Sequence, residues 1–258
     1  MKPPNWTSPE VSASADSQAQ RFYERYWEWR DENQYLYADA VPPRIDVALG
    51  ALERLGRSDG IGSTLVDVGC GEGTLGRVLR QAGLGYRTVG LDISEKALSL
   101  ARDHYDAVIP FDASAPLTDL IGLQSASVVT CLEVLEHVFD PAHLLREIRR
   151  VLRPGGALIA SSPNFAEWRS RVTVLRGQFP SESQHVFHEA EHLHYFTQRS
   201  LIELFDTSGF DVLRCGGALF DAPPGLRRLD HRLGQAITRA RPTLFARQLV
   251  LTAMPKHP

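Results

Sequence analysis

Residues 65–76 read LVDVGCGEGTLG, an apolar run with one carboxylate that passes into glycines at every second position. Such a run, followed by the periodic apolar residues Leu75, Val78 and Leu79, predicts a strand, a tight turn and the start of a helix. Glycine lets a backbone adopt positive φ and approach a ligand closely, and a helix N-terminus offers N–H groups without partners in the helix. The stretch therefore predicts a nucleotide-binding loop.

Two patterns overlap in this loop, and they favour different nucleotides. Residues 71–76 form G-x-G-x-x-G, with Asp92 about 20 residues further on, which is the dinucleotide fingerprint and favours NAD. Asp67, however, precedes a G-x-G-x-G register at residues 69–73. A carboxylate there can hold a cationic amino group, directly or through water, but would repel a pyrophosphate. We therefore favour a nucleoside that carries an amino acid.

The complete pattern D-x-G-x-G-x-G at residues 67–73 resembles motif I of class I S-adenosylmethionine-dependent methyltransferases. The resemblance implies S-adenosylmethionine as cofactor and an α/β fold: a Rossmann-like, doubly wound, seven-stranded sheet with an antiparallel last strand. We divide the chain into an N-terminal tail and helical lid (residues 1–40) and a methyltransferase domain (residues 41–258). An insertion after the fifth strand is expected at residues 164–197, because this segment is too long for a simple connection.

Aspartates follow the first strands of the predicted sheet. Strands are expected at residues 64–68, 88–92, 107–113, 127–132, 157–161, 210–215 and 248–253. By the resemblance, Asp92 accepts from both ribose hydroxyls, Asp112 accepts from the adenine amino group, and the Ala113 N–H donates to the ring. Alternatively, Asp92 caps the helix that begins at Ser94. The predicted cofactor contacts are Asp67, Gly69, Cys70, Gly71, Gly73, Asp92, Ile93, Asp112, Ala113, Leu132 and Glu133.

Residues 17–37 are rich in aromatic side chains and predict an amphipathic helix with Tyr23, Tyr26 and Trp27 on one face. Such a helix can simply pack on the domain. It can also close over the cofactor as a lid, because aromatic faces stabilise a sulfonium cation. Arg44 opens the next predicted helix, and the resemblance places it near the cofactor carboxylate.

Composition restricts the partners. The net charge is −3, and 25 arginines and 3 lysines are scattered among 31 acids, so a nucleic-acid surface is not expected. Three widely spaced cysteines without a C-x-x-C pair fit a reducing compartment. No apolar run reaches the ~20 residues of a membrane span, and the N-terminus lacks a signal-peptide core. We predict a cytoplasmic protein that does not bind membranes; its oligomeric state is left open.

Two segments point to different branches of the family. Residues 132–138 (LEVLEHV) and 152–156 (LRPGG) resemble the ubiquinone-biosynthesis O-methyltransferases, whereas residues 162–169 (SPNFAEWR) resemble the MetW group. The leading prediction is methyl transfer to a hydroxyl of a small-molecule acceptor. The alternatives are a MetW-like accessory protein that binds a biosynthetic enzyme, and a metal-assisted RNA 2′-O-methyltransferase.

Two histidines are the candidate catalytic residues. Transfer from a sulfonium releases a neutral group, so the protein has to align the acceptor and remove its proton. His137 after the fourth strand and His192 in the insertion are the candidates, since neutral imidazole is the usual base near pH 7. Alternatively, His137 caps the following helix, and His185, His188, His192 and His194 are surface polar residues.

A metal site is the alternative to a catalytic histidine at these residues. Glu133, Glu136 and His137, with one histidine from residues 188–194, resemble the ligand set of small-RNA 3′-end 2′-O-methyltransferases. Such a set suits zinc better than magnesium, and an ion there would lower the pKa of an acceptor hydroxyl. Because the Glu-His pair also occurs in metal-free relatives, we predict no metal.

Overall fold

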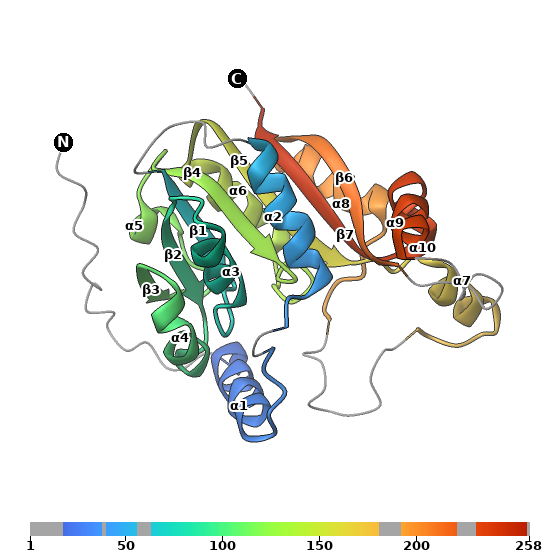
Figure 1. Cartoon of the computed structure of the whole chain (residues 1–258), viewed down its shortest axis with the longest axis horizontal. Coiled ribbons are helices and arrows are strands. Elements are labelled where there is room, and N and C mark those ends of the chain that lie inside the picture. The colour runs from blue at the N-terminus through green and yellow to red at the C-terminus, as the bar shows by residue number, and fades with distance from the viewer. Residues whose placement is uncertain (1–17, 38–39, 56–62, 181–191, 221–230, 257–258) are drawn as a thin grey trace.

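The computed structural model describes residues 18–37, 40–55, 63–180, 192–220 and 231–256 (Figure 1). Within them, one sheet of seven strands has the order β3-β2-β1-β4-β5-β7-β6. Strands β1 to β5 are mutually parallel, and β7 is antiparallel to both β5 and β6. This topology confirms the predicted doubly wound sheet with an antiparallel last strand.

The strands lie close to their predicted positions. They are β1 Thr64–Val68, β2 Arg87–Asp92, β3 Ala107–Pro110, β4 Ala126–Leu132, β5 Leu152–Pro163, β6 Phe210–Phe220 and β7 Ala246–Pro255. The third strand is shorter than predicted. It ends at Pro110, and the Asp112 carboxylate turns back to accept from the backbone N–H of Ser114 at 2.9 Å. Such an aspartate turn favours a loop over a continued strand.

Helices cover both faces of the sheet (Figure 1). They are α1 Gln18–Glu32, α2 Pro43–Leu55, α3 Thr74–Ala82, α4 Glu95–Ala101, the 3-10 helix η1 Arg102–His104, α5 Thr118–Ile121, α6 Pro141–Val151, α7 Trp168–Leu175, α8 Gln198–Thr207, α9 His231–Ala240 and α10 Pro242–Phe245. Apolar side chains of α5, α6 and α8 form the core on one face. Those of α2 and α3 form a second core on the other.

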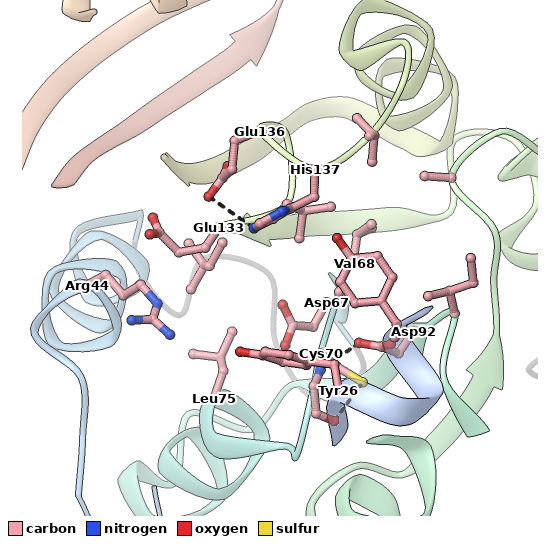
Figure 2. A pocket seen from close by; sticks show the side chains of 18 of the residues that line it. Tyr26, Arg44, Asp67, Val68, Cys70, Leu75, Asp92, Glu133, Glu136 and His137 are labelled. Atoms are coloured by element: carbon pink, nitrogen blue, oxygen red, sulfur yellow. Dashed lines mark hydrogen bonds and ion pairs between the residues drawn. The ribbon is translucent and has the colours of Figure 1, made fainter. Parts of the chain in front are cut away.

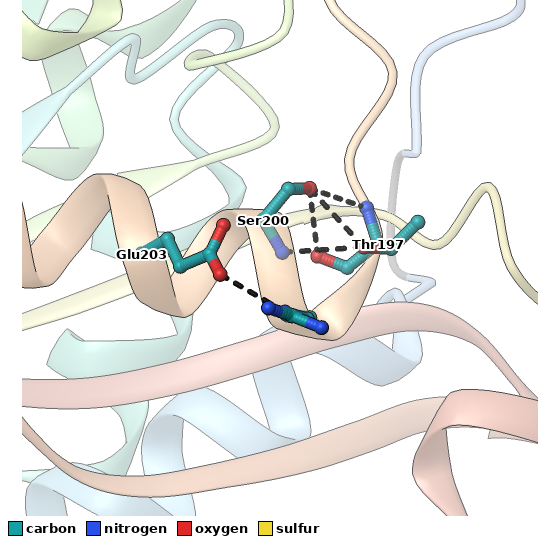
Figure 3. A network of polar contacts seen from close by, with 4 residues as sticks. Thr197, Ser200 and Glu203 are labelled. Carbon is teal, nitrogen blue, oxygen red and sulfur yellow. Dashed lines mark hydrogen bonds and ion pairs between the residues drawn. The ribbon is translucent and has the colours of Figure 1, made fainter.

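The last residue of the predicted insertion, Thr197, caps the helix that follows it. Thr197 and Ser200 form a reciprocal capping box at the start of α8 (Figure 3). This arrangement satisfies two N–H groups at the helix start and stabilises its first turn. The insertion contains α7, while residues 181–191, with His185 and His188, lie outside the described residues.

Other predictions also fall partly outside the described residues. The predicted N-terminal tail, residues 1–16, is one of them. Across the residues that are described, no helix is both long and apolar enough to span a bilayer. The division of the chain at residue 40 stays a prediction.

Candidate functional site

A cavity of about 1030 Å³ opens at the carboxyl ends of the parallel strands (Figure 2). One end lies against the glycine loop and the ends of β1, β2 and β3, and the other reaches the insertion and β7. In doubly wound sheets this edge is where ligands bind, because the connecting loops diverge there. Ligand pockets span roughly 300–1,000 Å³, so the cavity has room for a nucleoside and a second small molecule.

The glycine loop requires glycine at two positions along the cavity. Gly69 and Gly71 have φ of +72° and +53°, in the left-handed region that disfavours other residues. A Cβ on Gly69 would overlap the Val134 side chain, and one on Gly71 would lie 2.8 Å from the Trp27 ring. Glycine at these two positions therefore lets the Val134 and Trp27 side chains pack directly on the loop backbone.

Gly73 is the one predicted cofactor contact that does not line the cavity. It precedes the first residue of α3 and is not part of the cavity wall. A Cβ there would lie 2.9 Å from the Ala101 Cα, so this glycine allows the loop to pack against α4. The other ten predicted cofactor contacts all line the cavity.

Asp67 is held by the fold itself. Only 3% of the residue is exposed, and its two oxygens accept from the Tyr105 hydroxyl at 2.5 Å and the Thr130 hydroxyl at 2.6 Å. Burial raises the pKa of Asp67 to about 6, although both hydrogen bonds oppose the rise. The carboxylate thus supplies a fixed negative potential beneath the loop, where the sequence motif predicts a cationic amino group.

Asp92 links β2 to the glycine loop. Its oxygens accept from the backbone N–H of Gly71 at 2.9 Å and of Ser94 at 3.0 Å. Burial raises the pKa of Asp92 to about 6 against these hydrogen bonds. The cap of α4 is the Ser94 hydroxyl, which accepts from the Ala97 N–H, so the alternative that Asp92 caps this helix is wrong.

Glu133 is already engaged by neighbouring strands. Its oxygens accept from the Ser161 hydroxyl at 2.7 Å and from the Gln248 amide at 2.9 Å. Across the cavity, burial opposes protonation of Arg44, but the charge of Glu133 and contacts with Tyr37 outweigh it and raise the pKa of Arg44. Figure 2 shows Arg44 and Glu133 facing each other.

At the far end of the cavity, Glu136 is 1% exposed, and neither of its oxygens has a hydrogen-bond partner of normal geometry in the described residues. Burial raises the pKa of Glu136 well above its usual range, and the charge of Glu133 adds to the rise, while Ser162 opposes it. The His137 Nε2 lies 3.9 Å from Oε1 of Glu136 (Figure 2). A buried acceptor without a donor is costly, so this carboxyl is suited to meet a ligand.

The structure brings His192 to His137. Their ring centroids are 4.8 Å apart, and the ligand atoms of Glu136, His137 and His192 all lie within 4.8 Å of one another. The backbone causes this approach, because the N–H groups of Leu193 and His194 both donate to the Glu136 carbonyl. Asp140 caps α6 through the His143 N–H, so the alternative that His137 is the cap is wrong.

Helix α1 closes one side of the cavity. Tyr23, Tyr26 and Trp27 line it as the helical spacing predicts, and the Tyr23 ring meets the His137 ring edge-on at 6.1 Å. Arg247 and Gln248 on β7 also line the cavity. Sequence reasoning missed these two residues, because only the antiparallel pairing of Gln248 with Pro163 on β5 places them there.

Comparison with known proteins gives a consistent family. A model described as "Methyltransferase domain" matches residues 18–214. A probable S-adenosylmethionine-dependent methyltransferase of Mycolicibacterium smegmatis is 34% identical over 69% of this chain, and the match spans 63% of that relative's length. The ubiquinone biosynthesis O-methyltransferase of Idiomarina loihiensis is 27% identical over 76% of this chain and 80% of its own.

A solved structure supports the fold at low identity. The magnesium protoporphyrin IX methyltransferase of Synechocystis, determined with bound S-adenosylhomocysteine, superposes with a TM-score of 0.59. The two chains share 17% of their residues over 93% of this chain and all of the other. At this identity, the likeness concerns the arrangement of the elements alone.

Proposed function

Because this chain belongs to the class I S-adenosylmethionine-dependent methyltransferases, we propose that it transfers a methyl group to a hydroxyl of a small-molecule acceptor. The observation that carries the proposal is the single cavity that joins the glycine loop to Glu136, His137 and His192. The alternative of an NAD-dependent enzyme, which depended on the G-x-G-x-x-G pattern, is overturned by the family match.

The cofactor fits the loop end of the cavity. Gly69 and Gly71 present bare backbone, and Asp67 provides negative potential for the cofactor ammonium group. We expect Asp92 to accept from the ribose hydroxyls and Asp112 with Ala113 to contact the adenine, since all three line the cavity. The Arg44 guanidinium lies in the same cavity and is the candidate partner of the cofactor carboxylate.

The acceptor then occupies the part of the cavity beside Glu136 and His137. Its hydroxyl proton passes to a ring nitrogen of His137, the hydroxyl oxygen attacks the methyl carbon, and the carbon–sulfur bond breaks to release neutral S-adenosylhomocysteine. In its ionised form, Glu136 stabilises the imidazolium that forms, since its carboxyl oxygen lies 3.9 Å from Nε2. His192, whose ring centroid lies 4.8 Å from that of His137, is the second candidate base.

The walls of this space support a small apolar acceptor. The Tyr23 ring stacks edge-on against His137, and Val138 and Leu219 line the same cavity. Aromatic and aliphatic walls with a few convergent polar groups are typical of small-molecule sites. The substrate class is therefore proposed as a hydroxylated, largely apolar molecule.

Matched acceptors test the proposal. The full chain is incubated with S-adenosylmethionine carrying a deuterated methyl group and with paired hydroxybenzoates and aminobenzoates, and the products are identified by mass spectrometry. We expect methyl transfer to oxygen only. Transfer to nitrogen would overturn O-methylation, and cofactor binding without turnover, together with co-purification of a biosynthetic acyltransferase, would support the accessory role instead.

The cluster of Glu136, His137 and His192 favours a divalent ion as a second candidate. Two imidazoles and a carboxylate suit zinc, whose tetrahedral ligand atoms lie ~3.3 Å apart, so the cluster would have to contract to bind it. Glu133 does not join the set, because Ser161 and Gln248 occupy its oxygens. Elemental analysis of protein purified without chelator tests this candidate: about one equivalent, lost with activity in EDTA, supports it, and a metal-free active enzyme contradicts it.

A further inference from the structure

The Glu24 carboxylate connects helix α1 to the start of α4. The Glu24 side chain accepts from the Ser94 hydroxyl at 2.7 Å and from the Lys96 backbone N–H at 3.0 Å, both at the start of α4. About two turns further along the same face of α1, the Asp31 carboxylate pairs with the Lys96 ammonium at 2.6 Å. That ion pair is partly exposed to solvent, and exposed pairs contribute little, so Glu24 provides the stronger attachment.

Apolar contacts of α1 with the domain are less deeply buried than those of α2. None of the α1 side chains is fully buried, in contrast to α2, which buries four apolar residues against the sheet. Burial of apolar surface is the main source of helix docking in most domains. The aromatic side chains of α1 are only partly buried, so the two hydrogen bonds to Glu24 add to their packing at one defined point.

The attachment point is connected to the cofactor end of the cavity. Ser94, which is fully buried, donates its backbone N–H to Asp92, and Asp92 in turn accepts from the Gly71 N–H. Three hydrogen bonds therefore connect Glu24 on α1 to the glycine loop through Ser94 and Asp92. A shift of Asp92 on ligand binding would therefore change the hydrogen bond between Ser94 and Glu24.

The cavity-facing side chains of α1 cover the glycine loop and the candidate base. The Trp27 ring covers Gly71 so closely that a Cβ there would lie 2.8 Å away, and Tyr23 reaches His137. With the helix in this position, the glycine loop and the candidate base are both covered by the same element. A ligand that lies between them would contact α1, so movement of this helix would change its access to solvent.

We propose that α1 is the lid over the cofactor and that Glu24 is the positioning residue that keeps it closed. This inference rests on the proposed function for the identity of the cofactor. Glu24 touches neither cofactor nor acceptor; it acts by holding Trp27 and Tyr23 in place. Its loss should speed lid opening and cofactor exchange and leave the chemical step unchanged.

Hydrogen exchange and ligand release test the proposal in the full chain. In Glu24→Ala, amide exchange in residues 18–32 should become about 10-fold faster and S-adenosylhomocysteine should dissociate about 10-fold faster in stopped-flow tryptophan fluorescence, since hydrogen bonds to a charged group are lost. Exchange in the sheet strands should not change. The KM for S-adenosylmethionine should rise, with kcat at saturation unchanged or higher.

Matched variants separate the attachment from a general effect. Glu32→Ala, an exposed acid on the same helix, should behave as wild type. Glu24→Gln, which keeps the size but loses one acceptor, should be intermediate and controls for a folding defect. Exchange and release within 2-fold of wild type in Glu24→Ala would overturn the inference. If wild type binds no S-adenosylhomocysteine, the proposed function fails, while exchange in the ligand-free chain still decides the role of Glu24.

Discussion

The buried carboxylates at the two ends of the cavity differ in the hydrogen bonds that they receive. At the loop end, Asp67 and Asp92 each receive two hydrogen bonds from the fold. At the far end, Glu136 is as deeply buried but has no hydrogen-bond partner of normal geometry in the described part of the chain. The loop end is thus pre-organised by its own contacts, and the far end keeps its hydrogen-bonding capacity for a ligand. Substitutions at the two ends should therefore impair different properties of the protein.

The largest effect is expected at the far end. His137→Ala should lower kcat by about 10²–10⁴-fold, because proton removal by a positioned base contributes that much. The dissociation constant for S-adenosylmethionine should stay within 2-fold, since His137 does not belong to the loop. Steady-state kinetics and calorimetry measure the two quantities, with His104→Ala as the control histidine. A loss of cofactor affinity that matches the loss of rate would erase the distinction between the ends.

At the loop end, a side chain on Gly71 should abolish cofactor binding. In Gly71→Val the new atoms meet Trp27 at 2.8 Å and a backbone with φ of +53°, so affinity should fall by more than about 100-fold. Gly85→Val is the matched control, because φ there is +73° and nothing lies within 4 Å. Calorimetric titration with S-adenosylmethionine compares them. Equal losses in both variants would assign the effect to backbone strain instead of lost space.

The pH dependence of binding should report the loop-end acids. Burial raises the pKa of Asp67 and of Asp92 to about 6, so between about pH 4 and 6 the folded chain holds protons that the unfolded chain has released. The ligand-free protein should therefore become less stable as pH rises through this window. Affinity for S-adenosylmethionine should rise by about 10-fold, because the ionised acids bind the cation and the ribose.

Asp67→Asn controls for this pH effect. The amide does not titrate, so both the stability profile and the affinity profile should become flatter over the same window. Thermal unfolding and calorimetry from pH 4.5 to 7 record them. A variant that keeps the full wild-type profile would show that other groups cause the pH dependence.

The smallest effect concerns stability at the loop end. Tyr105→Phe removes a hydroxyl that donates to Asp67 and accepts from the Gly76 N–H, which leaves two buried groups with one partner fewer. The free energy of unfolding should fall by about 1–3 kcal/mol, a loss of a few degrees in Tm. Tyr86→Phe, on a half-buried phenol outside this network, should change Tm less. An unchanged Tm in Tyr105→Phe would mean that water replaces the hydroxyl.

Local sequence patterns predicted most of the loop end. The apolar run at residues 65–68 and the glycines that follow depend on short-range conformational preferences, and the strand and turn lie where they were expected. The third strand was predicted three residues too long, because the Asp112 turn competes with strand pairing. Gly73 was assigned to the ligand, although its neighbour in space is Ala101.

The far end could not be assembled from the sequence. His137 and His192 were named as candidates, but 55 positions separate them in the chain, and their contact depends on two N–H groups that donate to the Glu136 carbonyl. Arg247 and Gln248 carry no recognisable motif, and they reach the cavity through the register of β7 against β5.

By itself, the sequence determined the sheet, the glycine loop and the family, because each depends on residues close together in the chain and on the order of strands and helices. Only the tertiary structure decided which polar groups are already paired and which face the cavity unpaired. That outcome depends on contacts between distant segments, such as Tyr105 with Asp67 and Glu24 with Ser94. Spacing along the chain does not encode these distances, since packing of the whole domain sets them.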